Sequence, residues 1–448
     1  MRLKPHHEYY RVLVVCNSTR QVLATPCARG FRLPLISIPR WSRSVKEVHV
    51  ILEHMFGFPV AVVDIEPPSD GIGFVFAETF RGTQIKDRRG FRGVEMARLQ
   101  ECELSAAQRR AIESFGGRRS TQRGPFFRSG LFEDAVNWVR EVTGGMQGPA
   151  EITQFNASGF TLLARIKLPE ATYWLKAVAP QVNSEYRFTK ELSRLFPRFL
   201  PGVISFRDTW HAILMQDGGT ALSHQQCTLQ IIGKVALSLA ELQLSSVKHT
   251  KQLLEMGMAD VRVETVRAQI RASLPTMERS LEVQDLGGAP RISLRKLHAM
   301  CDEVERLCEV LGHLRMPDTL LHNDLHVENI VLDRVRCAFI DWASPAIGNP
   351  LLAYHQLRSG FLHRPRLYAR LSMTYKTALR QLAAPHQLDQ AVAILPGFAA
   401  AVELQQCLVR IGTPQQVEYQ SARRIRSLIR HLVRELEMGD EHYQRRYA

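Results

Sequence analysis

The spacing of hydrophobic positions changes along the chain and divides it into three regions. In the first region, strand-like apolar runs alternate with one helical segment, in which Val45, Val48, Leu52 and Met55 recur at three- and four-residue steps. This spacing predicts a helix from Ser44 to Phe56, with Gly57 at its C-terminal cap. The strand-like runs lie at 11–16, 60–65 and 73–78.

A Gly- and Ser-containing stretch at 116–130 follows and predicts a linker. Further strand-like runs lie at 173–178 and 212–215, after a short helical segment at 134–141. Beyond residue 219 the pattern is mostly helical, with segments at 229–244, 297–314 and 398–409. The order predicts a small β-rich region followed by a large helical one.

Two short apolar runs interrupt the helical region, at 330–332 and 338–340, and predict a hairpin. Asn329 directly precedes the first run and Asp341 directly follows the second, so the hairpin would bring them to the same end. Asp324 lies five positions before Asn329. Phosphoryl transfer from a nucleotide needs a carboxylate near the acceptor hydroxyl and oxygen ligands for Mg²⁺. These three residues could supply both.

The motif also has a plain structural interpretation, because polar residues cluster in turns and a lone His-x-Asp-x-x-x-x-Asn pattern arises by chance. The strand-flanked Asp341 at the matching distance favours the phosphotransfer interpretation.

The order from His322 to Asn329, followed by Asp341, resembles the catalytic loop and metal-binding Asp of the protein-kinase-like superfamily. The Asp341-Trp342 pair and the later Gly348-Asn349-Pro350 resemble the aminoglycoside phosphotransferase family and its choline-kinase relatives. The resemblance implies that Asp324 is the catalytic carboxylate, that Asn329 and Asp341 hold Mg²⁺, and that His322 braces the loop. It also implies ATP or GTP as phosphate donor and a small-molecule hydroxyl as acceptor.

A kinase-like loop predicts an upstream strand Lys and helix Glu that grip the nucleotide phosphates. Lys176 and Glu185 are the candidates, with Glu191 as an alternative on the same helical segment. Met215 begins the predicted hinge beneath which the purine would lie. The phosphate loop is reduced to a single Gly, and Ser158 with nearby backbone N–H groups is the candidate for reaching phosphate oxygens.

The first 118 residues resemble the Nudix fold, on the strand and helix order together with 31–34 before the helix and 56–58 after it. Nudix hydrolases bind Mg²⁺ through glutamates of that helix. Here the four corresponding positions hold Val50, Ile51, His54 and Met55, so the resemblance implies the fold without the hydrolase.

Composition adds limits on partners and location. The eight cysteines form no CxxC pair, which argues against a zinc site or a disulfide framework. The net charge of +14 favours anionic partners. Two arginine clusters, at 118–128 and 423–434, carry much of this charge. They lack interleaved aromatics, which favours a solvated linker and a solvated helix face over a nucleic-acid surface. No signal sequence or run of 18 apolar residues is found, so we expect a cytoplasmic protein without a membrane partner.

The sequence therefore predicts an α+β chain with a protein-kinase-like two-lobe fold preceded by a Nudix-like α/β/α domain. The expected parts are the Nudix-like domain at 1–118, a linker and lead-in helix at 119–148, the N-lobe at 149–216 and the helical C-lobe at 217–448. The alternative function is that of a non-catalytic pseudokinase or nucleotide-binding scaffold. The acceptor is left open, since Ala353 stands where the resembled pattern often has an Asp.

Overall fold

The computed structural model describes residues 6–447, except 29, 41–43, 69–70, 84–89, 101–102, 107, 109–122, 146–147, 183, 283–290, 333–336 and 417. The chain forms two compact units. The first comprises residues 1–197 and 201–218, and the second comprises 198–200 and 219–448. The expected boundary at residue 118 lies outside the described residues, so the division of the first unit remains a prediction.

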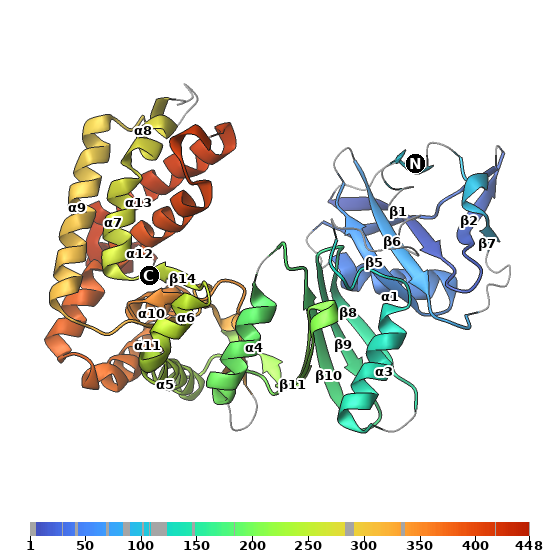
Figure 1. Ribbon diagram of the computed structural model, residues 1–448, viewed down its shortest axis with the longest axis horizontal. Coiled ribbons are helices and arrows are strands. Elements are labelled where there is room, and N and C mark those ends of the chain that lie inside the picture. Colours follow the sequence, from blue (N-terminus) through green and yellow to red (C-terminus); the bar gives the residue numbers. More distant parts are fainter. Residues whose placement is uncertain are drawn as a thin grey trace. The chain divides into compact units, whose positions relative to one another are not determined.

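A mixed sheet with one helix begins the first unit (Figure 1). Its elements are β1 (His7–Val15), β2 (Val22–Cys27), β3 (Gly30–Arg32), β4 (Leu35–Pro39), α1 (Ser44–Phe56), β5 (Val60–Glu66), β6 (Ile72–Thr79) and β7 (Arg92–Val94). The strand order is β3-β2-β1-β6-β5, with β1 and β6 parallel, while β4 pairs with β1 and β7 with β2. Val45, Val48 and Leu52 of α1 are buried against this sheet, as their spacing predicts.

An antiparallel five-stranded sheet completes the first unit, in the order β11-β12-β10-β9-β8. Its elements are α3 (Leu131–Thr143), β8 (Glu151–Ala157), β9 (Thr161–Lys167), β10 (Thr172–Val178), α4 (Glu185–Leu195), β11 (Val203–Arg207) and β12 (Ala212–Gln216). Helix α3 buries Phe132 and Trp138 against Leu175 and Leu214 of the sheet. Because side chains alternate along a strand, Lys176 belongs to the opposite face.

The two sheets of the first unit are joined by direct contacts. Helix α1 and strand β5 both pack against β8. The Gln154 side chain of β8 makes two buried hydrogen bonds of 2.7 Å with the backbone N–H and C=O of Val62 in β5.

The second unit is mainly helical, as predicted. Its helices are α5 (Leu229–Ser246), α6 (Thr250–Glu255), α7 (Val263–Ala272), α8 (Leu274–Glu282), α9 (Leu294–His313), α10 (Leu351–Ser359), α11 (Pro365–Ala378), α12 (Pro385–Ile411) and α13 (Tyr419–Tyr447). One small sheet contains β13 (Thr220–Ala221), β16 (Ile330–Leu332) and β17 (Cys337–Phe339), and another contains β14 (Ala259–Val261), β18 (Ala346–Gly348) and β15 (Thr319–Leu321).

Helix α12 is long and apolar enough to cross a bilayer by length and composition, which the search for apolar runs in the sequence did not anticipate. Its most apolar window is 61% buried within the protein, where α12 packs against α13, α9, α10 and α7. A core helix passes the same test, so this single helix is weak evidence for a membrane span.

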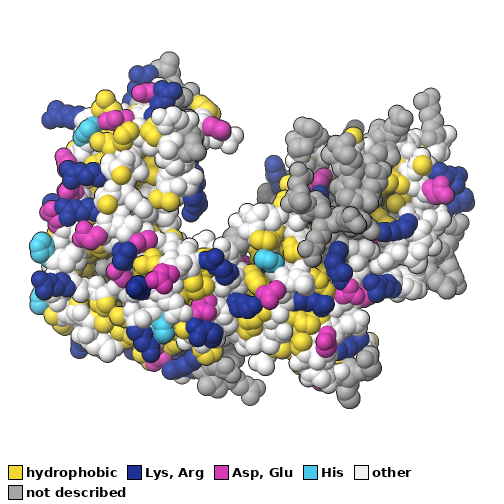
Figure 2. Space-filling view, viewed as in Figure 1, with side chains coloured by type: hydrophobic (Ala, Val, Ile, Leu, Met, Phe, Trp, Pro, Cys, Tyr) yellow, Lys and Arg dark blue, Asp and Glu magenta, His cyan; other side chains and the backbone are white. Residues whose placement is uncertain are grey.

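The interpretation of both arginine clusters as solvated is wrong for Arg426 and Arg123, whereas the Arg128 side chain is 39% exposed. Arg426 of α13 is 4% exposed and donates a hydrogen bond to the Ser280 carbonyl. Arg123 and Arg128 form ion pairs with Asp64 and Asp134. Elsewhere, Lys and Arg side chains lie dispersed among acidic ones on the face shown in Figure 2.

Candidate functional site

The loop from His322 to Asn329 follows β15 in the second unit and is held by a buried histidine. His322 is 2% exposed, and its Nε2 lies 2.7 Å from the Ile340 carbonyl oxygen beyond the hairpin. Its ring lies 4.5 Å from the ring of Trp342, measured between centroids. Burial lowers the pKa of His322 and so favours the neutral ring, in which Nε2–H can donate to this carbonyl. The predicted bracing contact of His322 is present.

Two left-handed residues shape this site. Asn323 has a φ of 64° and Asp341 a φ of 68°, conformations that Asn and Asp tolerate better than most residues. Immediately after the turn at Asn323, the Asp324 side chain is 66% exposed. Its carboxylate lies 4.0 Å from His326 Nε2. Asp324 is therefore displayed on a fixed backbone rather than buried in the fold.

Asn329 closes the loop from inside. Its Nδ2 donates to the Asp324 carbonyl at 2.9 Å and lies 3.0 Å from His326 Nε2. His326 Nδ1 in turn contacts Glu328 Oε2 at 2.9 Å, an interaction that the sequence did not suggest. Because the Asn329 amide nitrogen is used twice, its Oδ1 is the atom left for a ligand.

The predicted hairpin is confirmed. Strands β16 and β17 pair antiparallel, with Ile330 opposite Phe339, and the Ile340 N–H donates to the Asn329 carbonyl at 2.9 Å. Asn329 and Asp341 therefore flank the same end of the hairpin.

The donor set at this end suits Mg²⁺, since an amide oxygen and a carboxylate are hard oxygen ligands. In the described part of the chain, no group of three or more His, Cys, Asp and Glu side chains forms a metal cluster. A cation held here would need further ligands from nucleotide phosphates and water, which is common for Mg²⁺.

In the first unit, the predicted Lys–Glu pair is formed. Lys176 Nζ of β10 lies 2.5 Å from Glu185 Oε1 in the first turn of α4. The two side chains are 21% and 5% exposed. The alternative, Glu191, instead pairs with Arg194 on its own helix at 2.5 Å. The structure therefore selects Glu185 as the acidic partner of Lys176.

The β8–β9 loop uses its polar groups internally. Ser158 Oγ accepts hydrogen bonds from the backbone N–H groups of Phe160 at 3.2 Å and Thr161 at 2.9 Å. The Gly159 N–H donates to Asp64 Oδ1 at 3.2 Å. The donors that the sequence offers for phosphate are therefore already bonded, and a phosphate-binding role for Ser158 remains a prediction.

Met215 lies near the end of β12 and is partly buried opposite Trp174 and Val203. Beyond it, the Asp217 side chain accepts a hydrogen bond from Trp174 Nε1 at 3.3 Å. The predicted hinge segment is thus anchored to β10, while a contact of Met215 with purine remains a prediction.

Sequence reasoning missed two positioning side chains. Gln356 Oε1 of α10 accepts the Leu325 N–H at 3.1 Å and supports the loop beside Asp324. Asp64 accepts the Gly159 N–H from 95 residues away. Neither residue has a local pattern that would single it out.

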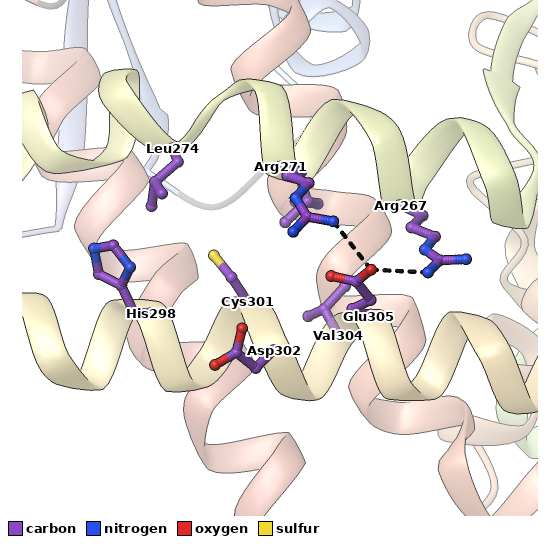
Figure 3. A pocket seen from close by; sticks show the side chains of 9 residues that line it. Arg267, Arg271, Leu274, His298, Cys301, Asp302, Val304 and Glu305 are labelled. Atoms are coloured by element: carbon purple, nitrogen blue, oxygen red, sulfur yellow. Dashed lines mark hydrogen bonds and ion pairs between the residues drawn. The ribbon is translucent and has the colours of Figure 1, made fainter.

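A cavity of about 140 Å³ lies in the second unit among α7, α8 and α9, away from the predicted site residues (Figure 3). Arg267 and Arg271 line it and both pair with Glu305, at 2.8 and 3.1 Å. Asp302 also lines the cavity, so its two arginines face two carboxylates and the formal charges of these four side chains balance.

The comparison with family models agrees with the motif. Residues 161–383 match the sequence model of the phosphotransferase enzyme family. No curated protein sequence matches the chain. Similar solved structures include an ethanolamine kinase from Plasmodium vivax, with 12% identity, coverage of 74% of this chain and 95% of that chain, and a TM-score of 0.43. A putative aminoglycoside phosphotransferase from Ralstonia eutropha has 15% identity, coverage of 69% and 99%, and a TM-score of 0.42.

Proposed function

Since residues 161–383 belong to the phosphotransferase enzyme family, we propose that this chain transfers the γ-phosphoryl group of ATP or GTP to a hydroxyl group of a small molecule. The predicted enzyme class, a small-molecule kinase, is confirmed by the family match. The donor, the metal dependence and the roles of individual residues are parts of the proposal.

The observation that carries the proposal is the exposed Asp324 on a braced loop. Its carboxylate is 66% exposed while His322 and Asn329 fix the backbone on either side. A carboxylate placed in this way can orient an acceptor hydroxyl and take its proton. Fixed geometry matters because positioning supplies much of the rate enhancement in phosphoryl transfer.

Asn329 Oδ1 and the Asp341 carboxylate would hold Mg²⁺, which neutralises charge on the nucleotide phosphates when bound. Lys176, steadied by Glu185, would bind phosphate oxygens as a point charge. These roles assign a separate task to each residue.

The test is a thermal-shift screen of the full chain with purine nucleotides, with and without Mg²⁺. A nucleotide at about a hundredfold excess over Kd should stabilise the fold by roughly 2–3 kcal/mol, and Mg²⁺ should increase the effect. Amino alcohols, sugars and aminoglycosides should then be assayed as acceptors with the nucleotide that binds.

A nucleotide that binds without transfer to any acceptor or water would support the second candidate, a nucleotide-dependent scaffold. The internally bonded N–H groups of the β8–β9 loop favour this candidate, because they withhold donors from the phosphates. The absence of a shift with every purine nucleotide would overturn the kinase proposal.

For the first 118 residues we propose a Nudix-like fold that has no hydrolase activity and serves as a binding, packing or regulatory module. Val50, Ile51 and Met55 have no side-chain oxygen, and His54 suits softer metals than Mg²⁺. The full chain should release no phosphate or pyrophosphate from nucleoside diphosphate derivatives with Mg²⁺ or Mn²⁺. Turnover that disappears on Glu53→Gln would contradict this.

A cytoplasmic location also remains a prediction.

A further inference from the structure

The β8–β9 loop is held by the N-terminal part of the chain at a single residue, Gly159, through its N–H and its C=O. The Gly159 N–H donates to Asp64 Oδ1 at 3.2 Å, and the Gly159 carbonyl accepts the Gly124 N–H at 2.6 Å. Both partners precede the five-stranded sheet in the sequence. The loop position is therefore set by the N-terminal part of the chain.

An irregularity in β5 accompanies the position of Asp64. The pairing of β5 with β6 shifts register between Val62 and Asp64, and the pairing of β8 with β9 shifts between Gln154 and Asn156. Gln154 bonds to Val62 across this junction. Bulges redirect side chains, and Asp64 lies where β5 can reach the loop.

Asp64 is fixed by a second partner. Its carboxylate is 12% exposed and forms an ion pair with Arg123, whose guanidinium lies 4.3 Å from the centre of the Phe127 ring. Burial raises the pKa of Asp64, and Arg123 acts in the opposite direction. Burying a carboxylate is unfavourable unless it is paired and hydrogen-bonded, and Asp64 has both kinds of partner.

Arg123 also explains the single glycine of the loop. A Cβ atom at Gly159 would lie 3.1 Å from both Cγ and Cδ of Arg123, closer than most such contacts. Gly159 thus lets the Arg123 side chain cross the loop. The glycine is used for packing against the N-terminal segment.

We propose that Asp64 is a positioning residue for nucleotide binding, because it holds the β8–β9 loop in the place from which the loop covers the nucleotide. This inference rests on the proposed kinase function. The N-terminal part of the chain thereby becomes a fixed support of the nucleotide site. The loop contributes its position, since the N–H groups of Gly159, Phe160 and Thr161 are already used.

A preset loop binds more tightly than a mobile one because less ordering is required on binding. Release of the Gly159 peptide should therefore raise the KM for nucleotide and leave kcat nearly unchanged. Asp64 does not touch Lys176 or the catalytic loop in any described hydrogen bond or ion pair, so the chemical step should be retained.

The experiment compares Asp64→Ala with two matched controls in the full chain. Asp64→Ala should raise the nucleotide KM on the order of fivefold. Glu66→Ala removes a carboxylate of the same strand that contacts Arg123 at 3.8 Å but has no described contact with the loop, and it should leave KM unchanged. Gln154→Ala weakens the same junction and should lower the melting temperature without changing KM. Asp64→Asn, the milder variant, should raise KM by less than Asp64→Ala and serves if that variant fails to fold.

Amide hydrogen exchange separates this inference from the proposed function. In Asp64→Ala or Asp64→Asn without nucleotide, exchange should accelerate in residues 157–161 and stay unchanged in β10. If the wild type binds no nucleotide, the kinase proposal fails, while exchange still decides whether Asp64 holds the loop. A lower melting temperature with unchanged KM and unchanged loop exchange would overturn the inference, and so would a lower KM.

Discussion

Carboxylates of the first unit and the Asp324 carboxylate of the 322–329 loop are placed in opposite ways. The Asp64 and Glu185 side chains are 12% and 5% exposed, Glu78 is buried, and each of the three has a described partner outside its own element. Glu78, for example, accepts hydrogen bonds from the Gly130 N–H and the Ser129 hydroxyl, both at 2.8 Å. The Asp324 side chain is 66% exposed.

This difference in exposure suggests that the buried carboxylates serve the fold and that Asp324 is available to a ligand. A buried charge is costly unless paired, so the interactions of the buried carboxylates are tied to folding and to pH. Asp324 owes its position to backbone contacts made by its neighbours, and its own oxygens are accessible. Substitutions in the first group should therefore change stability or the position of the groups they hold, whereas substitution of Asp324 should change the chemical step.

The largest effect is expected for Asp324→Asn. Loss of the proton acceptor should reduce phosphoryl transfer on the order of 10³-fold, with nucleotide affinity and melting temperature nearly unchanged. Asp341→Ala should instead weaken Mg²⁺-dependent nucleotide binding. Single-turnover kinetics and calorimetry measure the two effects. Equal loss of nucleotide affinity in both variants would show that the two roles are not separate.

Glu78 should make the free energy of unfolding depend on pH. Burial raises its pKa from 4.5 to about 7, so the folded state holds a proton that the unfolded state releases. The protonated form favours folding below pH 4.5, and this advantage is lost as the pH rises through 7. Glu78→Gln stays neutral, so it should be similar in stability at pH 4.5 and more stable than the wild type by up to about 3 kcal/mol at pH 8.

Denaturant unfolding of both proteins from pH 4.5 to 8 measures this difference. Asp324→Asn is the control, and its stability should follow that of the wild type across the range. A constant difference between wild type and Glu78→Gln would mean that Glu78 does not titrate in this range.

A smaller effect is expected for Glu185→Gln. Without the charge that steadies Lys176, the nucleotide Kd should rise about tenfold. Glu191→Gln is the matched control on the same helix, since it removes a carboxylate that pairs with Arg194. Titration calorimetry should find this control within about twofold of the wild type. Equal effects of the two substitutions would remove the special role of Glu185.

The smallest effect is expected for Ser158→Ala. The hydroxyl accepts the Phe160 and Thr161 N–H groups, so its loss should lower stability by about 1 kcal/mol. Nucleotide affinity should stay within about twofold, because the hydroxyl is used inside its own turn. Thermal unfolding and nucleotide titration check both. A tenfold loss of affinity would instead support direct phosphate binding by Ser158.

Residues that form one contiguous motif were predictable from the sequence. The hairpin and the placement of Asn329 and Asp341 follow from short-range spacing and strand pairing, while the bracing contact of His322 was implied by the family resemblance. The sequence left two candidate partners for Lys176, since Glu185 and Glu191 lie on the same helix. The packing of α4 decides between them, because it places Glu185 against Lys176 and leaves Glu191 paired with Arg194.

Contacts between distant segments were not predictable in the same way. Asp64 is one acidic residue in a strand, and no pattern in the neighbouring sequence indicates that it contacts Gly159, which lies 95 positions later. Arg426 resembles its exposed neighbours in composition, and only the helix packing buries it. Polarity alone therefore predicts solvent exposure for arginines that are in fact buried against partners from other elements.

The contact between Gln154 and Val62 also bears on self-association. Strand β8 forms one edge of the five-stranded sheet, and α1 and β5 cover it through Ala157 and Gln154. An uncovered sheet edge offers unpaired N–H and C=O groups to strands of other molecules and promotes aggregation. A shortened chain that lacks the first sheet would expose this edge. The N-terminal region thus shields the remainder of its unit from unwanted strand pairing, whether or not it binds a ligand.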